Sequence, residues 1–169
     1  MPSPLGHALG AVAAGFAASR STPAGPRTRG PWREAALFAA VGLLPDLDLA
    51  VGLHSQYTHS IGAVVVAFAL TWLFTRGRSV RFALAVALAY ATHPLLDWLG
   101  QDGTLPYGVM LLWPLDTGFY HSGLDLFTGI SRRYWLPGFL VHNLAAVARE
   151  VAILGPLALG AWFLRRRRR

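Results

Sequence analysis

Long apolar stretches, separated by short polar or Gly- and Pro-rich segments, dominate the hydrophobicity pattern of the chain. Apolar runs well beyond the roughly 4–8 residues of a buried strand predict α-helices. We therefore expect five helices, over residues 5–18, 32–44, 59–75, 80–99 and 139–164. Pro45 stops the second helix because proline cannot continue the backbone hydrogen bonding. Residues 46–53 are expected to continue as a turn or a new helix.

The segments between these helices are of two kinds. Residues 20–31 form a linker rich in Pro, Gly and Arg, and residues 100–138 form a long connection rich in Gly, Pro and Trp. Several of the expected helices are shorter than the roughly 20 apolar residues that a full membrane span needs. Tilting, local thinning of the bilayer or partial burial is expected to compensate for this.

The composition indicates a membrane protein rather than a soluble one. Hydrophobic residues make up 54% and charged residues 14% of the 169 residues, against roughly 45–50% and 25% in soluble domains. The length suits one domain, which we assign to residues 1–164, followed by a basic tail at 165–169. The expected fold class is all-α, a small membrane-embedded bundle of about five helices. With no cysteine in the chain, no disulfide framework is expected.

The arginine positions predict how the bundle is oriented. Twelve arginines lie between the first two helices, between the third and fourth, and after the fifth, whereas Arg132 and Arg133 lie in the other connections. The positive-inside rule places the twelve in the cytoplasm, together with the C-terminus. Residues 46–59 and 100–138 then face the outside of the inner (plasma) membrane. No nucleic-acid partner is expected, because these arginines are clumped between apolar runs.

Most histidines and acidic residues fall into three clusters, at residues 45–48, 58–60 and 93–97. Ionisable groups in membrane-type segments are costly to keep and mark functional sites. The predicted orientation brings the three clusters to the outer ends of the helices. Imidazole nitrogens and carboxylate oxygens bind zinc and harder cations, so we expect a metal site at the outer end of the bundle. Its expected ligands are His7, Asp46, Asp48, His59, His93 and Asp97.

Each candidate ligand also has a structural alternative. His93 and Asp97 share a helix face, so they bind one metal together, or Asp97 orients His93, or the pair is a helix end with its capping carboxylate. Asp46 and Asp48 either supply oxygens to one or two cations or form a solvated loop with an N-cap. His7 is either a ligand or a buried hydrogen-bonded histidine. His59 is either a ligand or a histidine of a helix-capping region.

Further polar residues are candidates for the chemistry around the metal. Asp48 or Asp97 is expected to orient the attacking water as a base, and His121, followed by Asp125, to protonate the leaving group. Arg132 and Arg133 either clamp an anionic headgroup or lie at the membrane interface. The remaining candidate for a substrate contact, or for a supporting role behind the ligands, is His54.

Several short motifs resemble the YdjM-like family. They are Gly6-His7, Leu43-Leu44-Pro45-Asp46-Leu47-Asp48, His54-x4-His59-Ser60, His93-x2-Leu96-Asp97 and Leu111-Leu112-Trp113-Pro114-Leu115. The family is described as LexA-binding, inner-membrane-associated, metal-dependent hydrolases, and the resemblance covers roughly residues 5 to 125. His54-Ser55-Gln56 departs from the His-Arg-Gly of the family. The order of ligands is more distantly similar to the all-helical zinc phospholipase C and nuclease group, but His142 is followed at +4 by Ala146, so a three-zinc centre is not implied.

The residues and the resemblance together predict a membrane-bound, metal-dependent hydrolase, a phosphoesterase acting on a lipid or lipid-linked substrate at the extracytoplasmic face. One or two divalent ions are expected, zinc first, with manganese or magnesium as alternatives. Metal suits this reaction because it neutralises phosphate oxygens and lowers the pKa of bound water. Two other functions stay open: a non-catalytic membrane module held together by metal, and an ion- or proton-coupled transporter. The transporter is disfavoured because the candidate ligands lie at one end and no internal repeat is present.

Overall fold

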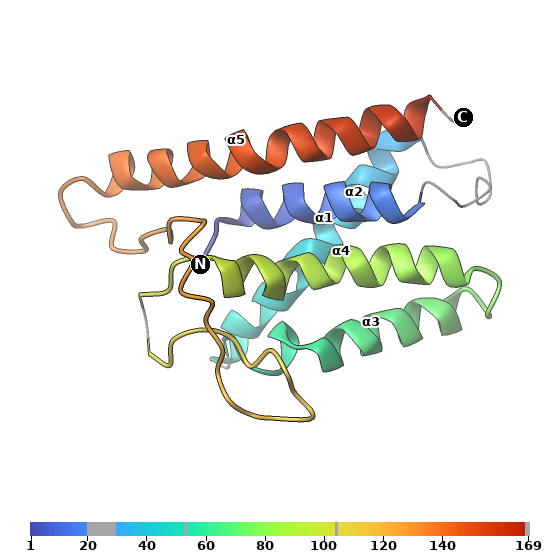
Figure 1. Ribbon diagram of the computed structural model, residues 1–169, viewed down its shortest axis with the longest axis horizontal. Coiled ribbons are helices and arrows are strands. Elements are labelled where there is room, and N and C mark those ends of the chain that lie inside the picture. The colour runs from blue at the N-terminus through green and yellow to red at the C-terminus, as the bar shows by residue number, and fades with distance from the viewer. Residues whose placement is uncertain (20–29, 53, 104, 168–169) are drawn as a thin grey trace.

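Five α-helices and two short 3-10 helices follow one another in the computed structural model, which describes residues 1–19, 30–52, 54–103 and 105–167. The predicted all-α fold with five helices is confirmed (Figure 1). Most of the linker predicted at residues 20–31 and the last two residues of the basic tail lie outside the described residues. The elements are α1 (Pro4–Ser19), α2 (Pro31–Leu43), η1 (Leu44–Val51), η2 (Tyr57–His59), α3 (Ile61–Phe74), α4 (Val80–Leu99) and α5 (Phe139–Arg166).

The helix ends follow from local residue chemistry. Pro31 opens α2, a position where the missing N–H costs nothing, and Pro45 lies in the first turn of η1, where the chain leaves α2. We predicted that the third helix begins at His59, but α3 begins at Ile61 because Ser60 is its N-cap and accepts a hydrogen bond from the Ala63 N–H at 3.1 Å. His59 therefore belongs to a separate 3-10 turn, η2.

The helix α1 lies in the middle of the bundle and packs against α2, α4 and α5, while α3 packs against α4. Figure 1 shows α2 crossing behind α1 and α4. Small residues let these backbones approach closely. A Cβ added to Gly42 of α2 would lie 2.4 Å from the Ala11 Cβ, and one added to Gly15 would overlap the Phe38 ring at 2.4 Å. The Gly- and Ala-rich sequence of α1 thus sets how tightly the neighbouring helices pack.

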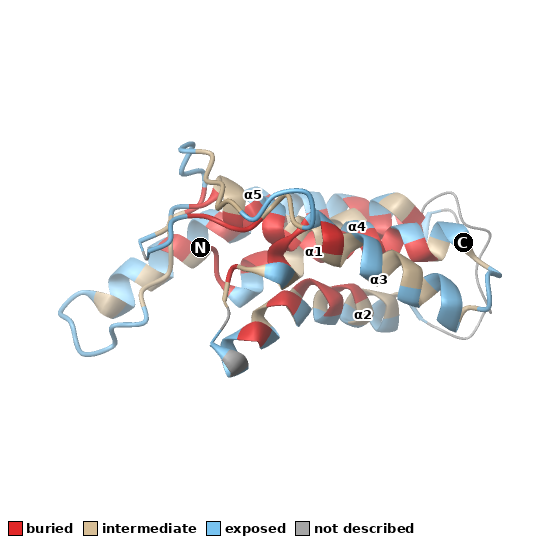
Figure 2. Ribbon diagram, turned by 90° about the horizontal axis from the view of Figure 1, so that it is seen from below, coloured by how far each residue is buried: buried red, intermediate tan, exposed pale blue. Residues whose placement is uncertain are grey.

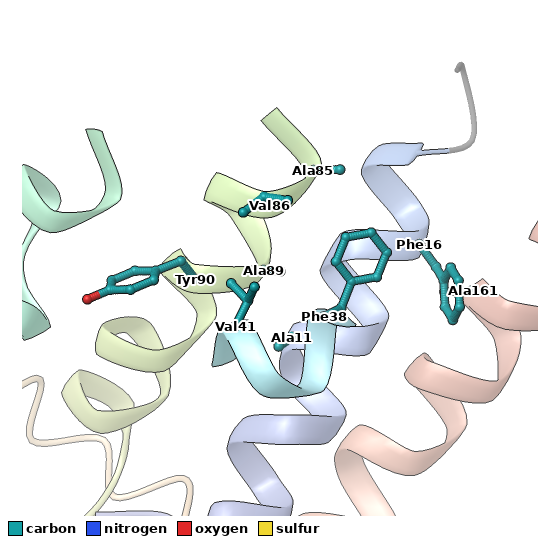
Figure 3. Close-up of a cluster of buried hydrophobic side chains, with 9 residues drawn as sticks. All are labelled: Ala11, Phe16, Phe38, Val41, Ala85, Val86, Ala89, Tyr90 and Ala161. Carbon is teal, nitrogen blue, oxygen red and sulfur yellow. The ribbon is translucent and has the colours of Figure 1, made fainter. Parts of the chain in front are cut away.

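A cluster of buried apolar side chains fills the space between α1, α2, α4 and α5 (Figure 3). The rings of Phe16 and Phe38 meet edge to face, with centroids 5.6 Å apart, which is a favourable aromatic geometry. Close packing of side chains of this kind holds apolar helices together within a bilayer. The cluster comprises Ala11, Phe16, Phe38, Val41, Ala85, Val86, Ala89, Tyr90 and Ala161.

Two of the described helices, α4 and α5, are long and apolar enough to cross a membrane, and the shorter α3 is also apolar. Large hydrophobic side chains are exposed along α3 and α5, for example Val65 at 65%, Phe74 at 85% and Leu157 at 58%. Figure 2 shows exposed residues along the outward sides of these helices and buried residues where helices face one another. Apolar surface of this extent marks a protein or membrane contact.

Both views show the same two ends of the bundle. The start of α2, the α3–α4 connection and the end of α5 lie at one end, while residues 100–138 lie at the other (Figures 1 and 2). Apart from Arg149, which lies within α5, the described arginines are divided accordingly: Arg33, Arg76, Arg78, Arg81, Arg165, Arg166 and Arg167 belong to the first end. Arg132 and Arg133 belong to the second. The start of α1, η1, η2 and the end of α4 also meet at this second end.

Candidate metal centre

Seven histidine and aspartate side chains from four helices and one turn converge at this second end. They are His7 of α1, Asp46 and Asp48 of η1, His54 of the following turn, His59 of η2, and His93 and Asp97 of α4. Two groups, His7–His93–Asp97 and Asp46–His54–His59, each bring three ligand atoms within 4.8 Å of one another. All six residues predicted as metal ligands are thus brought together, and His54 lies with them.

Four atoms form the centre of this cluster. The Nε2 atoms of His59 and His93 lie 3.0 Å apart. The Asp97 Oδ2 lies 3.4 Å from the first and 3.3 Å from the second. The Asp46 Oδ1 lies 3.9 Å and 3.5 Å from the same two nitrogens. Ligands bound tetrahedrally to zinc at about 2.0–2.1 Å lie about 3.4 Å from one another, so these five distances are close to those between zinc ligands.

Hydrogen bonds to the Nδ1 atoms of His59 and His93 determine which ring nitrogen carries the proton. The His93 Nδ1–H donates to the Gly42 carbonyl at 2.7 Å. The His59 Nδ1 lies 3.1 Å from Asp48 Oδ2 and 3.0 Å from the Thr58 hydroxyl. With the proton on Nδ1 in each neutral ring, both Nε2 atoms present lone pairs to the centre. Ligating histidines are fixed in this way by a carboxylate or a backbone carbonyl.

Asp97 is a buried carboxylate with 1% exposure. Neither of its oxygens makes a hydrogen bond within the described part of the chain, although nitrogens of His7, His59 and His93 lie 3.3–3.4 Å away. A buried anion is costly unless it is paired or binds a metal. Its position between three histidines therefore fits a metal ligand.

His7 contacts the second oxygen of Asp97. Its Nε2 is 3.4 Å from Asp97 Oδ1, and its ring stacks on that of His93 with centroids 3.7 Å apart. Asp97 therefore faces His59 and His93 with one oxygen and His7 with the other. A carboxylate in this position has the geometry to bridge two ions.

Asp48 supports the cluster from behind rather than facing its centre. Its carboxylate lies 3.0 Å from His54 Nδ1 and accepts a hydrogen bond from the Thr58 hydroxyl at 2.6 Å. Burial alone would raise the pKa of Asp48, but the hydrogen bonds from His59, Thr58 and His54 outweigh it and lower the pKa to about 2. Asp48 therefore stays ionised and orients His59 and His54.

Asp46 is the acidic residue of the cluster that is open to solvent, with 27% of its side chain exposed. Burial acts to raise its pKa, but the His93 side chain beside it lowers the pKa below the usual 3.8. Asp46 also lines a cavity of about 730 Å³. We call this hollow the polar cavity; its wall includes His7, Asp46, His54, Arg132, Arg133 and His142.

The polar cavity brings Arg132 and Arg133 to the same space as the candidate ligands. Arg132 and Arg133 are exposed and line its wall. His142 lines it as well, with Nε2 2.8 Å from the Gly129 carbonyl. The cavity therefore combines acidic, imidazole and guanidinium groups next to the candidate metal ligands.

His121, the proton donor expected from the sequence, makes its contacts elsewhere. Its Nε2 lies 2.9 Å from the Gly100 carbonyl and 3.4 Å from Asp125, and it is not among the residues that line the polar cavity. His54 does line that cavity, and its second nitrogen lies 3.2 Å from Met1 Sδ.

Two groups that orient the candidate ligands were not predicted from the sequence. The Thr58 hydroxyl donates a hydrogen bond to Asp48. Its position directly before His59, an expected ligand, is the sequence feature that could have predicted this role. The Gly42 carbonyl, which fixes His93, carries no side-chain signal at all. Only the crossing of α2 over α4 brings it within reach.

Comparison with known proteins identifies one family. A family model described as YdjM inner membrane protein matches residues 1–167. The match includes every residue of the cluster and the arginines of the polar cavity. No curated protein and no solved structure matches the chain.

Proposed function

We propose, from the premise that this chain belongs to the YdjM inner membrane protein family, that it is a membrane-bound, metal-dependent hydrolase. Its proposed substrate is a phosphoester on a lipid or lipid-linked molecule. The observation that carries the proposal is the pair of Nε2 atoms of His59 and His93, 3.0 Å apart and flanked by two carboxylates. Two facing lone pairs at this distance repel unless a proton or a metal ion lies between them.

The proposed metal ligands are His59, His93, Asp46 and Asp97, with His7 and the second oxygen of Asp97 available to a second ion. Two imidazoles favour zinc over magnesium, although manganese also accepts this donor set. A bound divalent ion would neutralise phosphate oxygens and lower the pKa of coordinated water towards 7. Asp46 faces the polar cavity and would yield one position of the ion to water or substrate, as catalytic sites require.

The other side chains have roles that follow from their positions. Asp48 holds His59 and His54 in orientation. His54 replaces His121 as the proposed proton donor, because His54 lines the polar cavity and Asp48 holds its Nδ1. Arg132 and Arg133 are proposed to bind the anionic group of the substrate, since guanidinium groups match phosphate oxygens. The arginine-rich opposite end supports an extracytoplasmic position for the site by the positive-inside rule.

Metal content and turnover of the protein purified in detergent test the proposal. We expect bound zinc and hydrolysis of a generic phosphodiester or phosphomonoester, both strongly reduced in His93→Ala and Asp46→Ala. Asp116→Ala is the matched control, because Asp116 lies in the connection at residues 100–138 and contacts Tyr120 rather than the cluster. Absence of metal from folded protein, or equal loss in the control, would contradict the proposal.

A second function, a metal-stabilised membrane module without catalysis, is favoured by one observation. His59, His93, Asp46 and Asp97 are four ligands, enough to close a tetrahedral structural site. In that case the purified protein would hold one tightly bound ion, lose thermal stability when chelated, and hydrolyse no ester across a broad panel. Turnover that depends on Asp46 would exclude it.

A further inference from the structure

We propose that a second, apolar hollow between α2, α3 and α4 binds the hydrocarbon chain of the lipid substrate, an inference that rests on the proposed function. We call it the α3–α4 groove. It has a volume of about 730 Å³. Its wall is formed by Leu37, Val41, Leu44, Tyr57, Thr58, Ala63, Val66, Ala67, Leu70, Thr71, Phe74, Thr75, Phe82, Val86, Tyr90 and Trp113.

The wall of the groove offers no charge and few hydrogen-bonding groups to a ligand. None of the described residues that line it is acidic, basic or histidine. Three of its hydroxyl groups already donate to backbone carbonyls: Thr71 to Ala67 at 2.8 Å, Thr75 to Trp72 at 3.0 Å, and Tyr90 to Thr58 at 2.8 Å. A polar ligand would lose its hydration here without compensation, whereas a hydrocarbon chain has no hydrogen-bonding group to leave unpaired.

One end of the groove adjoins the candidate metal centre. Thr58 lines the groove and donates a hydrogen bond to Asp48, and the next residue is His59. On the α2 side, Val41 lines the groove directly before Gly42, whose carbonyl binds His93. The wall of the groove therefore includes one residue next in sequence to a proposed ligand and another next to the carbonyl that binds a proposed ligand.

The groove opens along α3 onto the exposed apolar surface of that helix. Val66, Leu70 and Phe74 line it and are 51%, 49% and 85% exposed along α3. Since family membership places the protein in the inner membrane, lipid chains reach this side without crossing water. The two hollows differ in charge: Arg132 and Arg133 line the polar cavity, whereas no arginine lines the groove. This division matches an amphiphile with an anionic head and an apolar tail.

Photochemical labelling tests the inference directly. The full chain, in nanodiscs, is irradiated with a phosphatidylglycerol that carries a diazirine in one acyl chain. We expect saturable labelling of groove residues, reduced about tenfold in Ala67→Phe and Val66→Phe, because a ring that competes with the chain for packed space costs about 1–3 kcal/mol and about 1.4 kcal/mol is a factor of ten in affinity. Val65→Phe is the matched control: it is the neighbour of Val66 on α3, is 65% exposed and does not line the groove. Circular dichroism and gel filtration confirm that each variant is folded.

Turnover of two substrates separates this inference from the proposed function. Both groove variants should lower hydrolysis of a long-chain phosphodiester and leave that of a short, water-soluble one unchanged. Saturable groove labelling without any hydrolysis would support the groove and contradict the hydrolase. Hydrolysis that responds equally to Val66→Phe and Val65→Phe, or labelling that is not saturable and spread over α3 and α5, would overturn the groove. Blocking of the label by a co-purifying protein would overturn it as well.

Discussion

Asp48 is the residue on which most of the donor geometry depends, although it is not at the centre of the cluster. Its two oxygens hold His54 and His59 at 3.0 and 3.1 Å, and the Thr58 hydroxyl completes the arrangement. An ionised carboxylate behind a histidine fixes the ring and makes its other nitrogen a better ligand. Loss of this charge should therefore weaken metal binding without removing a central ligand.

Asp48→Asn is expected to lower zinc affinity by about 10–100-fold, the usual effect of removing such a supporting carboxylate. Competition with a chromophoric chelator measures this affinity in detergent. Asp116→Asn, at an exposed position in the connection at residues 100–138, is the matched control and should bind zinc as the wild type does. Unchanged affinity in Asp48→Asn would show that Asp48 does not orient His59.

The lowered pKa of Asp48 also predicts how the stability of the metal-free protein depends on pH. A carboxyl group with a lower pKa in the folded state contributes stability that is fully present above its unfolded pKa. That contribution is lost as the pH falls through the folded value. We expect the difference in melting temperature between wild type and Asp48→Asn to be largest well above pH 3.8 and to shrink as the pH falls towards about 2. Thermal unfolding in a chelator at several pH values measures it, and a difference that grows on acidification would contradict the assignment.

At the scale of elements, the contact of α5 with the start of α1 positions His7. Glu150 of α5 is fully buried. It accepts a hydrogen bond from the Ser3 N–H at 2.7 Å and another from the Ser3 hydroxyl. The Ser3 oxygen in turn accepts from the Gly6 N–H at 3.2 Å, as a helix N-cap does. Through these bonds Glu150 holds the first turn of α1 in place.

Glu150→Ala leaves the buried donors of Ser3 without an acceptor, which costs about 1–3 kcal/mol. We expect a lower melting temperature and loss of the second ion, the one proposed to bind His7. The ion bound by His59 and His93 should remain. Glu150→Gln, which keeps one acceptor, should have a smaller effect. Arg149→Ala, at the exposed neighbouring position, is the control. Metal analysis and thermal unfolding provide the two measurements, and an Arg149→Ala effect as large as that of Glu150→Ala would contradict this role.

At the scale of the whole molecule, the sequence predicted the helices and their common end better than the contacts within that end. The residues of α4 match the prediction because Ser79 and Gly100 bound a continuous apolar run. The arginine pattern placed the histidines and aspartates in one layer, and the cluster of the structure lies there. The pairing of His93 with Gly42 and the separate location of His121 could not be predicted, because they depend on how α2 crosses α4 and on the path of an irregular connection.

The orientation of the molecule in the membrane is the remaining whole-molecule property that the arginine pattern predicts. The chain has no cysteine, so a single introduced cysteine reports accessibility without background. Thr117→Cys, exposed in the connection beside the candidate site, should react with a membrane-impermeant maleimide in intact spheroplasts. Arg78→Cys, in the α3–α4 connection at the other end, should react only after permeabilisation, because the positive-inside rule keeps that end in the cytoplasm.

The same labelling experiment decides on which side of the membrane a substrate must be delivered. Arg76 and Arg81 remain in the connection that contains Arg78→Cys, so the charge asymmetry that sets the topology is largely preserved. Labelling of Arg78→Cys alone in intact spheroplasts would place the polar cavity in the cytoplasm. In that case the arginines at the opposite end would face outward, against the positive-inside rule, and the proposed extracytoplasmic site would be wrong although the metal ligands would be unchanged.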